Sequence, residues 1–197
     1  MKFFILKAAL LLMFLSLLCS PEALAQFEQK LTLQFSAGAS SLVSEDDVFK
    51  NGAMFNGGVQ YNFSRRFAMS GLVMYGMYFD NLDFDINATY FNLGVGASAK
   101  YKFLHASRVN PYLLFGVSAC FVKVDYTLGG NVFTFDQPVT PGILFGAGLD
   151  YNLSDNLAFF LQGGYNETFA RDDGFPSQGA IYALLGVNIS MFKARTL

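Results

Sequence analysis

Residues 91–103 read FNLGVGASAKYKF, and their side chains alternate in polarity along the whole stretch. One set of alternate positions is apolar or aromatic: Phe91, Leu93, Val95, Ala97, Ala99, Tyr101 and Phe103. The other set is small or polar: Asn92, Gly94, Gly96, Ser98, Lys100 and Lys102. Because successive side chains of a β-strand point to opposite faces, this period of two predicts a strand with one apolar and one polar face.

The same alternation recurs along most of the chain, for example at 31–38, LTLQFSAG. Extending it predicts eight strands, at 28–38, 52–63, 67–79, 88–103, 111–127, 139–153, 157–169 and 179–192. The connections near 64–66, 104–110 and 154–156 are short. Those near 39–51, 80–87, 128–138 and 170–178 are mostly longer and rich in Asp, Asn, Gly and Ser. This organisation is typical of an all-β, eight-stranded antiparallel up-and-down barrel.

An internal repeat marks two of the short connections. YNFSRRFAMS at 61–70 returns as YNLSDNLAFF at 151–160, and a glycine stands three residues before each tyrosine, at Gly58 and Gly148. In both copies an aromatic residue ends one strand, a polar break follows, and an apolar run begins the next strand. The repeat therefore predicts the same tight turn between two antiparallel strands, and not a catalytic motif.

The first 25 residues have the features of a secretory signal peptide. Lys2 and Lys7 precede the apolar run AALLLMFLSLL, and the small-residue pattern A-L-A ends at Ala25. We expect cleavage after Ala25, with a barrel domain at 26–197. A membrane anchor fits less well because the run is short. A lipoprotein acylated at Cys19 also fits less well, because Leu18 occupies the position where such signals need a small residue.

The composition of residues 26–197 gives no sign of a disulfide-stabilised, cofactor-binding or nucleic-acid-binding protein. Removing Lys2, Lys7 and Glu22 from the 13 basic and 15 acidic residues leaves 11 and 14, a net charge of −3. Cys120 is then the single cysteine, so no intramolecular disulfide is expected. The glycine pairs at 57–58, 129–130 and 163–164 are expected to be strand and loop glycines. We predict no cofactor, no metal and no nucleic-acid partner.

Two kinds of barrel share the alternating pattern. A soluble, lipocalin-like barrel would bind a small apolar ligand among inward apolar residues, whereas an outer-membrane barrel turns its apolar faces to lipid. A soluble exterior is roughly 25–35% charged, but this chain is 14% charged. Its polar strand faces hold mainly Gly, Ser, Asn, Gln and Thr, which suit a narrow lumen. The composition therefore favours a transmembrane barrel, whose closure leaves no backbone group unpaired in lipid.

The membrane interpretation makes specific predictions for the side chains. The lumen should be filled by Gln34, Gln60, Lys100, Asp150 and Gln162, and Lys100, Lys102 and Asp150 should form an ion-paired plug near the short turns. Aromatic residues should form two girdles at the strand ends. The first comprises Tyr61, Phe63, Phe67, Tyr101, Phe103, Tyr112 and Tyr151, and the second Tyr75, Tyr78, Phe79, Tyr90, Phe133, Phe135 and Phe169.

The A-L-A signal end, the repeat at 58–68 and 148–158, and the final strand AIYALLGVNISMF resemble the OmpA/OmpX-like class of small eight-stranded outer-membrane barrels. This class is also described as an outer membrane protein beta-barrel domain, porin-family-like. The resemblance implies a Gram-negative outer-membrane location, with the termini and short turns in the periplasm. It also implies insertion by the barrel assembly machinery, which reads a last strand such as this one, with Ile189 and Met191 on one face and Phe192 near its end. Five residues follow Phe192, which departs from the usual aromatic terminus.

The sequence indicates no catalytic site. The single histidine, His105, falls in a short turn predicted to face the periplasm, so a barrel enzyme acting on outer-membrane lipid is the less favoured alternative. The acidic groups fall in long loops and lack calcium-loop spacing. They are Glu45-Asp46-Asp47, Asp80/Asp83/Asp85 and Asp172-Asp173.

We predict a monomeric structural or surface-interaction protein without a wide pore. Its partners would be outer-membrane lipids and lipopolysaccharide, and its surface ligand would bind the loops at 39–51, 80–87, 128–138 and 170–178.

Overall fold

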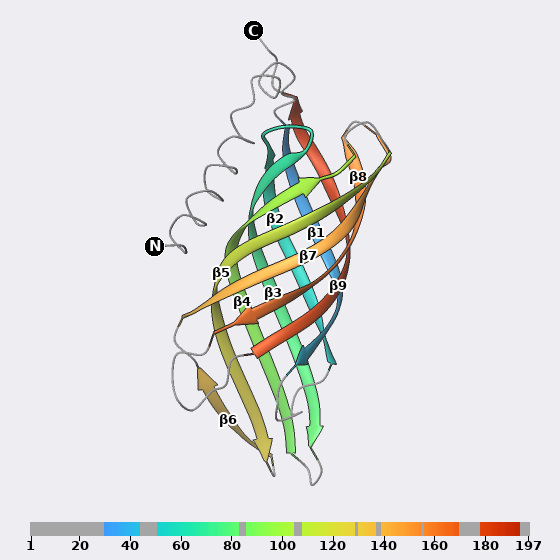
Figure 1. Cartoon of the computed structure of the whole chain (residues 1–197). Helices are drawn as coiled ribbons and strands as arrows, with labels where there is room; N and C mark the ends of the chain where they lie inside the picture. Colours follow the sequence, from blue (N-terminus) through green and yellow to red (C-terminus); the bar gives the residue numbers. More distant parts are fainter. Residues whose placement is uncertain are drawn as a thin grey trace, which may run out of the picture.

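The computed structural model describes residues 30–43, 51–82, 86–104, 108–128, 130–136, 139–154, 156–169 and 178–193. They form β1 (Lys30–Val43), β2 (Asn51–Asn62), β3 (Phe67–Leu82), β4 (Ile86–Lys102), β5 (Val109–Leu128), β6 (Asn131–Asp136), β7 (Thr140–Asn152), β8 (Leu157–Thr168) and β9 (Gln178–Lys193). The strand order is β4-β3-β2-β1-β9-β8-β7-β5-β6, and an additional pairing of β4 with β5 closes the ring. The fold is therefore an all-β, closed eight-stranded antiparallel barrel, with β6 outside the ring (Figure 1). No helix among the described residues is long and apolar enough to cross a membrane.

All eight predicted strands are present, but some are longer than expected. β1 continues to Val43, and the β3–β4 ladder continues to the pair Leu82↔Ile86, so much of the predicted loops 39–51 and 80–87 is strand. β6 lies inside the predicted loop 128–138 and pairs with the end of β5. It was missed because all six of its residues are exposed, so no buried face imposes an alternation of polarity on the sequence.

The repeated stretch does form the same turn twice, as predicted. The Ser64 hydroxyl oxygen accepts hydrogen bonds from the backbone N–H groups of Arg66 (3.2 Å) and Phe67 (2.9 Å). The Ser154 hydroxyl oxygen accepts the corresponding bonds from Asn156 (3.4 Å) and Leu157 (3.2 Å). These turns, the end of β4, the starts of β5 and β1, and the end of β9 lie at one end of the barrel, here named the short-turn end (Figure 1). The opposite end, from which β5 and β6 project, is named the long-connection end.

The apolar strand faces point outward. Exposed large side chains cover the barrel wall, among them Leu93, Val95, Leu113, Phe115, Val117, Phe145, Leu161 and Leu185. A wall of this kind would present far more apolar area to water than soluble monomers do. The orientation is the reverse of what a lipocalin-like carrier requires, so the soluble ligand-binding alternative is wrong.

The aromatic girdles are confirmed in part. At the short-turn end the rings of Tyr61 and Phe63 are 4.8 Å apart and those of Tyr101 and Phe103 are 5.5 Å apart, with Phe63, Tyr101 and Phe103 exposed. Tyr78, Tyr90 and Tyr112 do not lie in the girdles, because all three are buried inside the barrel. Tyrosine can occupy the interior because its ring fills space while its hydroxyl can form a hydrogen bond. Phe133 and Phe135 lie on β6, outside the ring of barrel strands.

Candidate functional site: the lumen and the projecting hairpin

An ion-pair plug, defined as Lys100, Lys102 and Asp150, occupies the lumen near the short-turn end. Asp150 on β7 lies with one carboxylate oxygen 3.6 Å from Lys100 Nζ and the other 3.0 Å from Lys102 Nζ, both on β4. Lys100 and Asp150 are each 1% exposed, and Lys102 is 19% exposed. The Lys100 ammonium also lies 4.1 Å from the centre of the Tyr112 ring. The predicted pairing is confirmed, and it places three charges in the interior of the barrel.

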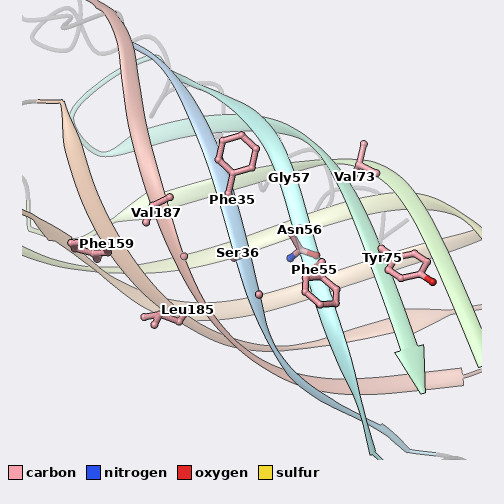
Figure 2. A pocket seen from close by; sticks show the side chains of 12 residues that line it. Phe35, Ser36, Phe55, Asn56, Gly57, Val73, Tyr75, Phe159, Leu185 and Val187 are labelled. Carbon is pink, nitrogen blue, oxygen red and sulfur yellow. The ribbon is translucent and has the colours of Figure 1, made fainter. Parts of the chain in front are cut away.

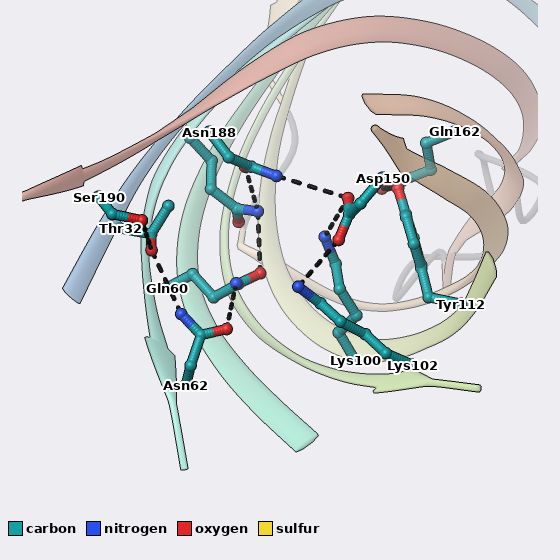
Figure 3. Close-up of polar contacts among 11 residues, drawn as sticks. Thr32, Gln60, Asn62, Lys100, Lys102, Tyr112, Asp150, Gln162, Asn188 and Ser190 are labelled. Atoms are coloured by element: carbon teal, nitrogen blue, oxygen red, sulfur yellow. Dashed lines mark hydrogen bonds and ion pairs between the residues drawn. The ribbon is translucent and has the colours of Figure 1, made fainter. Parts of the chain in front are cut away.

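A chain of hydrogen bonds connects the plug to the opposite wall of the lumen (Figure 3). Asn188 donates to Asp150 (3.5 Å), and Gln34 donates to both Asn188 (2.9 Å) and Gln60 (3.0 Å). Gln60 then donates to Asn62 (2.8 Å). The chain joins side chains from β1, β2, β7 and β9, so it braces strands that are distant in sequence. The predicted lumen residues Gln34 and Gln60 therefore belong to this network.

The rest of the lumen is more apolar than predicted. One cluster at the middle of the barrel contains Met54, Met74, Tyr112, Leu114, Leu144, Tyr182 and Leu184. A second cluster, toward the long-connection end, contains Tyr78, Ala88, Tyr90, Val122, Val124 and Ala180. Alternation identifies which residues share a face, but it does not predict which of them are large. The inward glycines leave gaps, and large apolar side chains from neighbouring strands fill them. At Gly94, for example, a Cβ would lie 2.8 Å from the Met74 terminal methyl group.

A small cavity lies in the lumen among the described side chains. It has a volume of about 40 Å³ and is lined by Gln34, Asn56, Ser98, Gln162 and Tyr182 together with apolar neighbours. The volume is comparable to that of one or two water molecules. Gln162, also predicted to fill the lumen, accepts a hydrogen bond from Tyr112 (3.1 Å) and donates one to Tyr182 (3.2 Å).

A larger hollow lies on the outside of the barrel wall. This groove of about 670 Å³ crosses β1, β2, β3, β8 and β9 where the small residues Ala37 and Gly57 separate larger side chains. Figure 2 shows Phe35, Phe55, Val73 and Leu185 around it. Its lining is mainly apolar, with Ser36, Asn56 and Tyr75 as the polar members, so it offers mostly hydrocarbon contacts.

The β5–β6 hairpin extends beyond the barrel at the long-connection end (Figure 1). Val132, Phe133 and Phe135 of β6 are 64%, 50% and 49% exposed. Asp125 on β5 accepts hydrogen bonds from the Thr134 hydroxyl (2.7 Å) and the Lys123 ammonium (3.1 Å), and the bond from Thr134 ties the two strands together. β6 is the last strand in the sheet order, so its second edge pairs with no described strand.

Most of the other candidate residues lie where the structure gives no description. His105, Glu45-Asp46-Asp47, Asp83, Asp85 and Asp172-Asp173 lie outside the described residues, and for Asp80 only the backbone is described. Among the described residues, no group of three or more His, Cys, Asp or Glu side chains is positioned to bind a metal ion. Cys120 is buried in the lumen beside Ser118.

The sequence matches the family model for the outer membrane protein beta-barrel domain over residues 9–188. No curated protein sequence matches the chain. Among solved structures, the Neisserial surface protein A is similar, with a TM-score of 0.59 and 20% identity over 82% of this chain and 97% of that one. The attachment invasion locus protein Ail of Yersinia pestis has a TM-score of 0.56 and 16% identity over 84% of this chain and 100% of that one.

A major outer membrane protein from Thermus thermophilus has a TM-score of 0.56 and 15% identity, over 84% of this chain and 100% of that one. At these identities the solved structures show a shared fold. The closed barrel with an apolar outer wall defines an outer-membrane barrel protein. Together with the match over most of its length, this places the chain in the outer membrane protein beta-barrel domain family.

Proposed function

We propose that this protein is a monomeric outer-membrane barrel that acts at the cell surface through its β5–β6 hairpin, without catalysis. Residues 1–25 would be removed as a signal peptide, and the barrel assembly machinery would insert residues 26–197. The termini and short turns would face the periplasm, because short turns do so in bacterial outer-membrane barrels. The long-connection end would then face outward, among the lipopolysaccharide.

The exposure of β6 is the observation that carries this proposal. Val132, Phe133 and Phe135 remain exposed in a strand whose outer edge pairs with no described strand. Natural proteins usually protect such edges, because an unpaired strand attracts another polypeptide segment. An exposed apolar edge at the cell surface therefore suits recognition of a polypeptide by strand addition.

The charge at the long-connection end favours a partner that is not strongly anionic. Its strand ends and connections contain many more acidic than basic residues. The acidic residues are Glu45, Asp46, Asp47, Asp80, Asp83, Asp85, Asp125, Asp136, Glu167, Asp172 and Asp173, and the basic residues are Lys50, Lys123 and Arg171. Ail has been solved in complex with the heparin analogue sucrose octasulfate. Because like charges repel, we do not extend that polysulfated ligand to this protein.

A double substitution in β6 tests the surface role. Phe133→Ser with Phe135→Ser removes two exposed rings while leaving all eight barrel strands unchanged. We expect normal assembly, measured as heat-modifiable gel mobility, but reduced adhesion of intact cells to immobilised extracellular-matrix and serum proteins. The matched control is Phe115→Ser with Phe145→Ser, a ring pair 5.0 Å apart on the barrel wall, which should impair assembly instead.

The competing structural role predicts a different outcome. If the β6 variant adheres normally, and only complete deletion has an effect, through increased envelope permeability, then the protein serves membrane integrity alone. Turnover of a lipid by the purified protein, abolished by His105→Ala, would support the alternative of a barrel enzyme and contradict our proposal.

A further inference from the structure

The two copies of the repeated turn differ in charge at the same two positions. Ser64 and Ser154 accept equivalent hydrogen bonds and shape both turns. The residues that follow are Arg65-Arg66 in the first copy and Asp155-Asn156 in the second. Because the second copy makes the same turn without arginine, the turn does not require these two cations, and their presence calls for another explanation.

A third exposed arginine lies on the same side of the rim. The Arg66 carbonyl oxygen accepts the backbone N–H of Lys102 (2.7 Å), which places the first turn beside the end of β4. Arg108 stands directly before β5, the strand that pairs with β4, and its carbonyl oxygen accepts the backbone N–H of Asn152 (2.8 Å). We name Arg65, Arg66 and Arg108 the arginine collar. All three are exposed, and among the described residues none of them forms an ion pair.

The collar adjoins aromatic side chains suited to a membrane interface. The Phe63 ring lies 5.9 Å from the Phe67 ring on either side of the first turn, and Tyr101 and Phe103 are exposed at the end of β4. Aromatic rings at this level fix the depth of the barrel in the bilayer. Arginines just beyond them lie at the level of the lipid headgroups, where a guanidinium group can bind a phosphate through two hydrogen bonds.

We propose that the arginine collar binds the phosphate groups of anionic phospholipids in the periplasmic leaflet of the outer membrane. This assignment of the leaflet rests on the orientation given under the proposed function. Phosphate binding itself does not depend on that orientation, because it can be measured in a symmetric bilayer. The collar would select an annular lipid by charge, on the side of the barrel formed by β3, β4 and β5.

Electron spin resonance of lipids in reconstituted bilayers tests the proposal. The mature barrel is placed in phosphatidylcholine bilayers at low salt, and the association of spin-labelled phosphatidylglycerol is compared with that of spin-labelled phosphatidylcholine. Each collar arginine at a contacting headgroup should favour the anionic lipid by about fivefold. The variant Arg65→Asp with Arg66→Asn copies the second turn, so it should fold normally and lose most of the preference. Arg108→Gln should lose part of it.

Lys123→Gln is the matched control, because it removes an exposed cation from the opposite end of the barrel. It should leave the lipid preference unchanged, and salt should weaken the preference of the wild-type protein. A wild-type barrel with no preference for phosphatidylglycerol, or a turn variant that keeps the preference, would overturn the proposal. A further contrary result is displacement of the spin-labelled phosphatidylglycerol by lipopolysaccharide only when the collar is intact. That result would assign the collar to the outer leaflet, and it would also contradict the proposal.

Discussion

Asp150 forms ion pairs with two lysines inside the barrel, whereas Asp125 forms an ion pair with one lysine at the surface. Breaking a buried ion pair by removing one partner costs about 3–5 kcal/mol, because the remaining charge stays desolvated. Exposed pairs contribute about 0–1 kcal/mol. The same chemical change at these two aspartates therefore separates the effect of burial from the effect of charge.

We predict that Asp150→Asn lowers the free energy of unfolding by about 3–5 kcal/mol, since it leaves Lys100 buried without its counter-ion. Asp125→Asn should change it by less than about 1 kcal/mol. Reversible urea unfolding in lipid bilayers measures both values. Equal losses in the two variants would show that the ion-pair plug does not brace the lumen.

Two glycines differ in how closely other atoms approach them. A Cβ at Gly148 would clash with the Leu161 carbonyl oxygen and the Tyr112 ring, whereas a Cβ at Gly71 would meet nothing within 4 Å. Overpacking of this kind costs about 1–3 kcal/mol. We predict this loss for Gly148→Ala and less than about 0.5 kcal/mol for Gly71→Ala, measured by the same urea unfolding. A Gly148→Ala variant as stable as the wild type would contradict the close approach of β7 and β8.

The sequence predicted residues well where an alternating pattern was sufficient. It identified Gln34, Gln60, Lys100, Asp150 and Gln162 as lumen residues, since they share strand faces with small polar neighbours. It misplaced Tyr78, Tyr90 and Tyr112, because a tyrosine at a strand end fits both an interfacial girdle and a barrel interior. Which of the two it occupies depends on side chains from neighbouring strands, and single-strand periodicity carries no information about them.

An exposed polar contact holds the β5–β6 hairpin together. The Thr134 hydroxyl donates to Asp125 and lowers the pKa of that carboxyl below its usual value, with a smaller contribution from Lys123. A carboxyl group with a lowered folded-state pKa stabilises the fold above its unfolded-state pKa. That contribution disappears as the pH falls through the lower, folded-state pKa.

We therefore predict that the hairpin loosens in acid, below about pH 4, and not between about pH 5 and 8. Thr134→Val should raise the pKa of Asp125 toward its usual value, so the hairpin should be looser at neutral pH and its looseness should depend less on pH. NMR titration of the Asp125 carboxyl carbon in micelles measures the pKa, and amide exchange in β6 measures the loosening. An unchanged Asp125 titration in Thr134→Val would contradict the hydrogen bond.

The eight barrel strands could be predicted because each has one face toward the lumen and one toward lipid. β6 could not, because both of its faces are exposed and its register depends on β5. The sequence interpretation also missed the arginine collar. A signal for it was present, because the two copies of the repeat are otherwise similar but differ at 65–66 and 155–156.

The packing of the lumen determines whether the barrel can conduct ions. Eight strands enclose an interior just wide enough for side chains, and the ion-pair plug and two apolar clusters occupy it. We predict little or no steady conductance in planar lipid bilayers. Large, stable single-channel steps would contradict a side-chain-filled lumen. Asp150→Asn should loosen the ion-pair plug, so barrels of this variant should open more often than wild-type barrels.

In the orientation that we propose, the barrel spans the outer membrane with the β5–β6 hairpin outside the cell and the arginine collar in the periplasm. Cysteine labelling in intact cells measures this orientation. In a Cys120→Ser background, Thr134→Cys and Arg65→Cys each introduce one cysteine at an opposite end of the barrel. A membrane-impermeant maleimide should label Thr134→Cys in intact cells, and label Arg65→Cys only after the outer membrane is permeabilised. Labelling of Arg65→Cys alone in intact cells, or of neither variant until permeabilisation, would contradict this orientation.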